Sequence, residues 1–451
     1  MFLKIYVDRN LERVNFPRAP WSCLLHLDLL QTATSKANRR RPRSGGQHSI
    51  WRIVLLLCLV MATPLSQAST ASFPPKANAA WIYDPPADNG SRGKVKPGHF
   101  TDVLTHYNDD ASSGARISEF YIYAGDMEMY CPEHRAKQCQ PDDFHVYYSN
   151  AAQHGNAIGG RDDHHGNTSV QAYARWLSAH PLPDGEPALI VPIIDGVVSG
   201  HGALRGFNDL SRKQAEAFAD KVTEQVCADD SVDGIQFDLE PFNVVRQAGQ
   251  YYFYKRIAQN FASRSKRCVD SSHPQGRFFS IFTVANRIRP GTPSADNVQK
   301  IMQVANNGYL IDALYDLKGT LPGHQTSAKD YQKLVQRETS NMRNWAAQIG
   351  IKFQFGVPAA ASAHEFGECR GAPCQASQKT VHGNAVSIQL AYVKSAVAAI
   401  RSSGAMQDPH YLGVALWAWS PGLHYKGMQF SPKVPGAAVT HFLSEALVNK
   451  G

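Results

Sequence analysis

Asp233-Gly-Ile-Gln-Phe-Asp-Leu-Glu240-Pro-Phe-Asn243 has the pattern of a strand that ends in polar residues. Side chains alternate across a strand, so one face carries the apolar residues Ile235, Phe237 and Leu239. The other face carries the polar residues Gln236, Asp238 and Glu240. In a barrel the polar face points inward, and Pro241 places Glu240 at the carboxyl-end rim, where barrel enzymes hold catalytic groups. The alternative is an edge strand whose polar face meets water.

Strand-like and helix-like segments alternate along the rest of the chain. The apolar, strand-like runs are residues 119–124, 144–148, 188–194, 232–239, 278–284, 309–315, 352–357 and 411–417. The helical segments are residues 170–180, 211–227, 244–267, 297–306, 328–349, 387–403 and 437–448. Eight such units predict an α/β fold, a closed (β/α)8 TIM barrel. An open doubly wound sheet is the alternative, but no glycine-rich phosphate loop follows any of these runs.

The amino-terminal segment predicts export. Arg52 precedes an apolar run at residues 53–62, and Ser66-Gln67-Ala68 supplies small residues for cleavage. This order is typical of a secretory signal peptide, and the run is shorter than the ~20 residues of a membrane span. We therefore expect residues 1–68 to be a basic leader with a signal peptide, residues 69–98 an irregular arm, and residues 99–451 one barrel domain. The mature protein would be secreted or periplasmic.

The positive charge belongs to this leader. The full chain has a formal net charge of +8, which by itself suggests a polyanionic partner. Residues 1–68 hold ten basic and three acidic side chains, and the remaining residues hold 36 basic and 35 acidic ones. The body of the protein is thus nearly neutral. We expect no nucleic-acid partner, no stable membrane association after cleavage, and a monomer.

Cysteine usage agrees with export. Beyond the leader six cysteines remain, and an even number in an exported chain indicates disulfides. The simplest of the possible pairings joins Cys131 to Cys139, Cys227 to Cys268 and Cys369 to Cys374. Free buried thiols are the alternative. None of the spacings is typical of a zinc site, and we expect neither a metal nor a cofactor.

Several segments together resemble family 18 glycoside hydrolases, the chitinases and endo-β-N-acetylglucosaminidases. Residues 233–240 resemble the family signature D-G-x-D-x-D-x-E, with Gln236 in place of one aspartate. Ala313-Leu-Tyr315-Asp316 resembles the M-x-Y-D segment of the sixth strand. Phe355-Gly-Val-Pro358 is similar to the seventh-strand L-G-x-P, and Gly413-Val-Ala-Leu-Trp417 to the eighth-strand segment. The third-strand S-x-G-G is not recognisable in residues 191–200.

The resemblance implies a retaining, substrate-assisted cleavage of β-linked N-acetylglucosamine glycans. Glu240 would be the general acid/base, and Asp238 would orient the substrate acetamido group and stabilise an oxazolinium-like intermediate. Tyr315 would hydrogen-bond the acetamido oxygen, and Trp417 would stack on the sugar. The remaining matched positions, Asp233, Gln236 and Asp316, would belong to the substrate-binding set. The partner implied is a polysaccharide or oligosaccharide substrate.

The departure at Gln236 affects the acid chemistry. In the family the aspartate at this position exchanges a proton or hydrogen bond with the position of Asp238, and a neutral amide cannot accept that charge. We therefore expect an altered pH dependence rather than a loss of activity. Two other functions stay open: a non-catalytic lectin on the same barrel, and a glycosidase that uses two carboxylates, Glu240 and a second acid such as Asp316.

Overall fold

A computed structural model gives the architecture of the chain. It describes residues 73–82, 98–130, 144–148, 170–196, 204–239, 242, 244, 248–317, 328–359, 385–417, 419, 423–425, 428–430 and 435–447. The chain divides into two units, residues 1–69 and 70–451. All described residues lie in the second unit. The predicted leader, including its signal peptide, lies outside the described residues.

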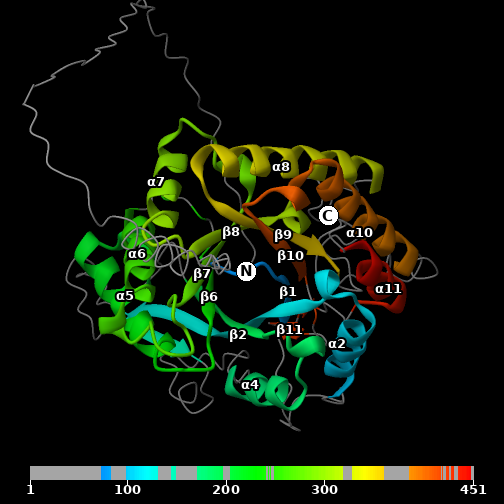
Figure 1. Cartoon of the computed structure of the whole chain (residues 1–451). Coiled ribbons are helices and arrows are strands. Elements are labelled where there is room, and N and C mark those ends of the chain that lie inside the picture. The colour runs from blue at the N-terminus through cyan, green and yellow to red at the C-terminus, as the bar shows by residue number, and fades with distance from the viewer. Residues whose placement is uncertain are drawn as a thin grey trace, which may run out of the picture. The chain divides into compact units, whose positions relative to one another are not determined.

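Eight parallel strands close into a barrel with helices around it (Figure 1). The barrel strands are β1 (Asn78–Ile82), β2 (Ile117–Tyr130), β4 (Leu189–Gly196), β6 (Gly234–Asp238), β7 (Phe278–Thr283), β8 (Gly308–Ala313), β9 (Lys352–Pro358) and β10 (Tyr411–Trp417). Each pairs with the next, and β1 closes the barrel because it pairs with both β2 and β10. The predicted (β/α)8 TIM barrel is confirmed, and the open sheet is excluded.

Two of the sequence expectations were wrong in the first third of the chain. The arm expected over residues 69–98 contains the first barrel strand, β1, and the start of helix α2 (Gly98–Asp110). The run at residues 144–148 is β3 (Phe144–Tyr148), which pairs antiparallel with the far half of β2 and lies outside the barrel. The prolines near β1 suggested irregular structure, yet only five residues are needed to fill the gap between β2 and β10.

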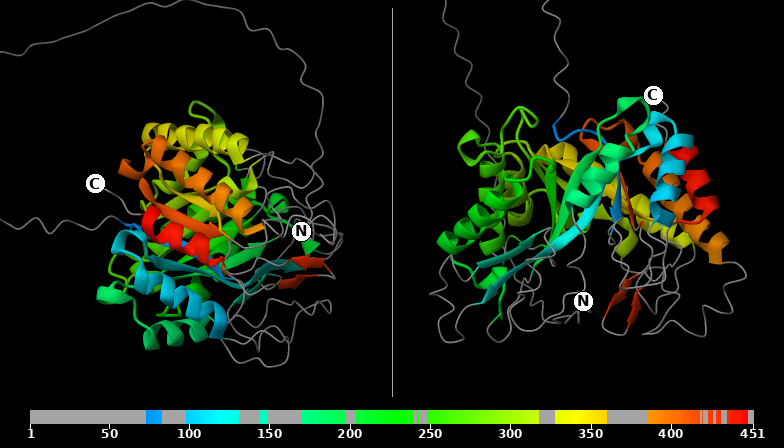
Figure 2. Two further views of the ribbon diagram at one scale, coloured as in Figure 1. Left: turned by 90° about the vertical axis from the view of Figure 1, so that its right-hand side faces the viewer. Right: turned by 90° about the horizontal axis from the view of Figure 1, so that it is seen from below.

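The other elements complete the ring and the barrel ends. The remaining helices are α4 (Val170–Ala179), α5 (Arg212–Val226), α6 (Ala248–Phe261), α7 (Pro293–Met302), α8 (Ala328–Ile349), α10 (Ala385–Ser402) and α11 (Ala437–Ala446). Short 3-10 turns are η1 (Ser113–Ala115), η4 (Pro183–Gly185), η5 (Phe207–Asp209), η6 (Arg264–Lys266), η7 (Ala285–Arg287), η8 (Leu314–Asp316) and η10 (Ala405–Gln407). Strand β5 (Leu204–Arg205) pairs with β2, and β11 (Leu423–Tyr425) pairs with β12 (Met428–Phe430). In Figure 2, β2 with β3, and β11 with β12, extend toward the same end of the barrel.

Local sequence explains where two of the helices begin. Helix α5 begins after Ser211, whose hydroxyl accepts a hydrogen bond from the Gln214 N–H in a capping box. Helix α7 begins four residues earlier than expected, because Thr292 caps it and Pro293 fits the first turn. None of the helices in the described part of the chain combines the length and apolarity needed to cross a bilayer.

The barrel wall separates two cores. The larger lies between the strands and the helices and includes Ile235, Phe237 and Leu239. The smaller fills the barrel and is rich in aromatic side chains, among them Trp81, Tyr121 and Tyr309. This division follows from the alternation of side chains along each strand.

A closed hydrogen-bond network occupies the barrel interior near the amino ends of its strands. Glu119 is 2% exposed and accepts hydrogen bonds from the Tyr309 hydroxyl at 2.6 Å and the Gln354 amide at 2.6 Å. Tyr121 donates to the Gln354 amide oxygen at 2.6 Å, and its hydroxyl lies 2.7 Å from that of Tyr309. Burial raises the pKa of Glu119 to about 7, although these hydrogen bonds act in the opposite direction.

A disulfide joins Cys227 to Cys268, with an S–S distance of 2.06 Å. Cys227 ends α5, and Cys268 follows α6 and η6, so the bond ties neighbouring helices. This pairing confirms one of the three predicted. Cys131, Cys139, Cys369 and Cys374 lie outside the described residues, and their pairings stay predictions.

Replacement of Glu119 by glutamine should change the pH dependence of stability. Because the folded state raises the pKa of this carboxyl, the folded protein holds the proton more tightly than the unfolded chain. Stability from this group is therefore greatest below the unfolded pKa and falls as pH rises through about 7. Between pH 5 and pH 8 the wild type should lose about 2.5 kcal/mol relative to Glu119→Gln, measured by urea unfolding.

The comparison at two pH values cancels any fixed effect of the glutamine amide. Glu224→Gln, an exposed change on α5, is the control and should follow the wild type. A wild-type-to-variant difference that is the same at both pH values would contradict the assignment.

Candidate active site

Strand β6 presents its two faces as the sequence predicts. The Phe237 ring packs against Phe253 and Tyr254 of α6, with centroids 5.2 and 5.6 Å apart. Gln236 and Asp238 occupy the alternate positions, and Gln236 reaches the inner core. The outward edge-strand alternative is thereby excluded for the described part of this segment.

Gln236 binds the first barrel strand. Its side-chain oxygen accepts a hydrogen bond from the Trp81 indole N–H at 2.8 Å, and both side chains are buried. An indole N–H inside a core needs such an acceptor, since an unsatisfied donor costs ~1–3 kcal/mol. The amide that departs from the family pattern thus has a defined structural partner.

Trp81 is also the centre of an aromatic cluster formed with Tyr315, Trp417 and Phe282. Tyr315 and Trp417 stack nearly parallel, with centroids 4.8 Å apart and an 8° angle. Trp81 meets both edge-on at 5.6 and 5.7 Å, and Phe282 lies 5.9 Å from Tyr315. Tyr315 is buried in η8 directly after β8, while Trp417 ends β10 and is partly exposed.

A glycine on the neighbouring strand makes room for this cluster. A Cβ atom at Gly356 would lie 3.0 Å from a ring carbon of Tyr315 and 3.2 Å from one of Trp81. Any larger residue at position 356 would require these rings to shift. Close packing of the two rings therefore explains why a glycine occupies position 356 in the predicted seventh-strand segment.

Asp238 ends β6 beside Asp195, the last residue but one of β4, and the two are register partners. Asp238 is partly buried. Burial of the carboxyl and the neighbouring charge of Asp195 raise the pKa of Asp238 to about 7. Asp238 thus has the raised pKa that is common among carboxyls of acid–base sites.

A second acid pair lies behind the carboxyl end of β7. Asp312 of β8 accepts the Ala285 N–H at 3.0 Å, and Glu338 of α8 accepts the Asn286 N–H at 2.9 Å. Burial and their mutual repulsion raise the pKa of Asp312 well above its usual range, and burial raises the pKa of Glu338. The pair thus holds the turn η7 onto the barrel.

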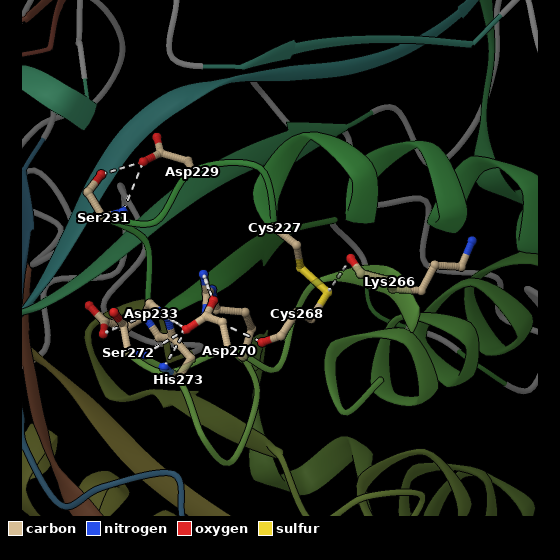
Figure 3. A network of polar contacts seen from close by, with 10 residues as sticks. Cys227, Asp229, Ser231, Asp233, Lys266, Cys268, Asp270, Ser272 and His273 are labelled. Carbon is tan, nitrogen blue, oxygen red and sulfur yellow. Dashed lines mark hydrogen bonds and ion pairs between the residues drawn. A yellow bond between two sulfur atoms is a disulfide. The ribbon is translucent and has the colours of Figure 1, made fainter. Parts of the chain in front are cut away.

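Asp233 lies at the opposite, amino end of β6. Its carboxylate accepts the Ile190 N–H at 2.7 Å and lies 3.4 Å from the His273 ring. Figure 3 shows it beside Asp270 and His273, near the Cys227–Cys268 disulfide. These contacts join β6 to β4 and to the loop before β7, at the end of β6 away from Asp238.

Other predicted residues cannot be placed. Glu240 lies outside the described residues, and the side chain of Asp316 is likewise not described, although its backbone closes η8. Of the predicted set, the structure brings Gln236, Tyr315 and Trp417 together around Trp81, and puts Asp238 two residues beyond Gln236. In the described part of the chain no group of three or more His, Cys, Asp or Glu side chains could hold a metal ion.

Sequence reasoning missed Trp81 as the centre of the site and Asp195 as the neighbour of Asp238. The short apolar run Asn78–Ile82 could have indicated a strand. Asp195 directly follows the apolar run at residues 188–194, but its pairing with Asp238 depends on the register of the two strands.

Comparisons with known proteins give only distant likenesses. No family model and no curated protein matches the sequence. Among solved structures, a family 18 chitinase from Crocus vernus is 13% identical, covers 75% of this chain and 91% of its own, and has a TM-score of 0.37. A chitinase from Chromobacterium violaceum is 10% identical, and the match covers 83% of this chain and 100% of the chitinase, with a TM-score of 0.42. A family 5 xyloglucanase from Paenibacillus pabuli is 9% identical, and the match covers 83% of this chain and 99% of the xyloglucanase, with a TM-score of 0.43. Scores below 0.5 are too low to assign this chain to any of these families.

The sugar-stacking role that the sequence resemblance implies for Trp417 predicts that removal of its ring weakens sugar binding. Trp417→Ala deletes the partly exposed member of the stack, and we expect the dissociation constant for an oligosaccharide of β-linked N-acetylglucosamine to rise roughly tenfold, for a loss of about 1–2 kcal/mol. Isothermal titration calorimetry measures this change. Trp176→Ala removes an indole that stacks on exposed His180 of the outer ring and should leave binding unchanged. Equal affinities of the wild type and Trp417→Ala would contradict a binding role.

Proposed function

We propose that the protein is a glycoside hydrolase that cleaves β-linked N-acetylglucosamine-containing glycans with retention of configuration. One observation carries the proposal: Trp81 contacts Gln236, Tyr315 and Trp417 at once. Residues of three motif segments, separated by about 180 residues of sequence, therefore meet around one side chain. Inward-facing side chains from any strands of a barrel can meet in its interior. Here the side chains that meet around Trp81 come from the three segments that resemble the family.

The chemistry assigns one task to each group. Glu240, as the general acid, protonates the leaving oxygen of the glycosidic bond, and the substrate's acetamido oxygen attacks the anomeric carbon. Asp238 faces the acetamido nitrogen, where positive charge develops. Glu240 then removes a proton from the water that opens the intermediate. Two displacements at one carbon retain its configuration.

The aromatic cluster suits this reaction. The partly exposed Trp417 offers an apolar face to a sugar, and Tyr315 behind it fixes the orientation of that ring through the parallel stack. Rigid placement of the sugar lowers the barrier because less orientational freedom is lost in the transition state. We also propose that the chain is exported and processed near Ala68, which would give a nearly neutral protein suited to an uncharged polysaccharide.

Replacement of Glu240 by glutamine tests the assignment of the acid. The amide cannot donate a proton to the leaving oxygen, so turnover of chitooligosaccharides should fall by at least ~10²–10⁴-fold. Binding measured by calorimetry should stay within about threefold, since the amide keeps the size of the carboxyl. Glu224→Gln on the outer helix α5 is the matched control and should keep full activity.

The two alternative functions, a lectin and a two-carboxylate glycosidase, predict different results when binding, turnover and inhibition of the wild type are measured. Binding by the wild type without turnover would indicate a lectin. Turnover that a thiazoline mimic of the oxazolinium ion does not inhibit would indicate a two-carboxylate glycosidase. Full activity of Glu240→Gln would contradict the proposed acid.

A further inference from the structure

Asp195 and Asp238 occupy equivalent places at the ends of two neighbouring strands. Ile193 pairs with Gln236, Ile194 with Phe237, and Asp195 with Asp238 along β4 and β6. Ile193 lies in the inner core and Ile194 in the outer one, so alternation puts Asp195 on the inner face, as it does Asp238. Adjacent parallel strands lie ~4.8 Å apart, which brings the two carboxyls side by side.

Tight packing fixes this arrangement. The Gly196 N–H donates to Asp195 Oδ1 at 2.6 Å. A Cβ atom at Gly196 would lie 2.4 Å from the Leu239 side chain, so no larger residue fits there without a shift. The residue after Asp195 thus packs against the side chain of the residue after Asp238, in agreement with the register of the two strands.

Among the described side chains, few charged or titratable groups lie near Asp238. On β4 it faces Asp195, and from α6 the phenol of Tyr254 interacts with it electrostatically. The Tyr254 hydroxyl is buried without a hydrogen-bond partner in the described part of the chain, and burial raises its pKa well above the usual range. On β7, the strand on the other side of β6, the inner residues Ser280 and Phe282 carry no charge.

We propose that Asp195 and Asp238 form one acid pair that carries a single proton, and that Asp195 is the positioning residue that takes this proton when positive charge develops beside Asp238. This role rests on the proposed function. Gln236 cannot serve as the acceptor, because it is neutral and its oxygen is occupied by the Trp81 N–H.

The proton movement leaves the total charge unchanged. Before the reaction, the proton on Asp238 avoids two adjacent negative charges. As the acetamido nitrogen becomes cationic, the proton passes from Asp238 Oδ to Asp195 Oδ, and Asp238 becomes the carboxylate that faces the cation. The pair keeps a charge of −1 throughout, and the proton returns when the intermediate is hydrolysed.

Carbon-13 NMR of protein labelled at the aspartate carboxyl tests the pair directly. Resonances of Asp195 and Asp238 are assigned by their loss in Asp195→Asn and Asp238→Asn. In the wild type both resonances should titrate in two coupled steps, the upper one near pH 7. In Asp195→Asn the pKa of Asp238 should fall by at least ~1 unit, because the neighbouring negative charge is gone. Asp296→Asn removes an exposed charge on α7 and should leave the pKa of Asp238 unchanged.

Activity separates this inference from the proposed function. In the wild type kcat/KM should fall as pH rises through about 7, where the pair loses its single proton, and this fall should be absent from Asp195→Asn, in which Asp238 has no second carboxyl beside it. An unchanged pKa of Asp238 in that variant would overturn the pair even in an active enzyme. If Asp195→Asn does not fold, the resonance of Asp238 is still assigned through Asp238→Asn, and a single independent titration step of Asp238 in the wild type would overturn the pair as well. Coupled steps without hydrolysis of any chitooligosaccharide would leave the pair standing and remove the proposed function.

Discussion

The buried hydrogen bond from Trp81 to Gln236 is the contact on which the site depends. It joins the first strand of the barrel to the fourth, 155 positions apart in sequence. Because β1 is only five residues long, its place between β2 and β10 depends strongly on what its side chains contact inside the barrel. Trp81 supplies that contact, and its ring edges then set the positions of Tyr315 and Trp417. The same side chain therefore takes part both in the closure of the barrel and in the aromatic cluster.

The barrel also buries several carboxyl groups. Glu119 lies at the amino end of the interior, Asp238 at the carboxyl end, and Asp312 behind the wall. In each case desolvation is the largest cause of the raised pKa. Their settings differ: Glu119 is enclosed by hydrogen-bond donors, whereas Asp238 stands beside a second carboxyl and remains partly exposed. The first arrangement favours rigidity, and the second favours a proton that can move.

The sequence predicted the later part of the barrel well and its beginning poorly. Alternation in residues 233–240 correctly indicated which side chains face the helices, because period two follows directly from strand geometry. Strand β1 was missed because prolines and small residues surround it, and its stability comes from partners far along the chain. The neighbours of Asp238 could not be predicted for a related reason: the register between β4 and β6 follows from the stagger of the whole barrel, not from either segment.

In the proposed mechanism the substrate's own acetamido group is the nucleophile. The most direct measurement compares hydrolysis of two oligosaccharides of the same length and linkage, one of N-acetylglucosamine and one of glucosamine. We expect cleavage of the acetylated compound alone, with the β-anomer as the first product by proton NMR. Equal cleavage of both compounds, or an α-anomer as the first product, would contradict it.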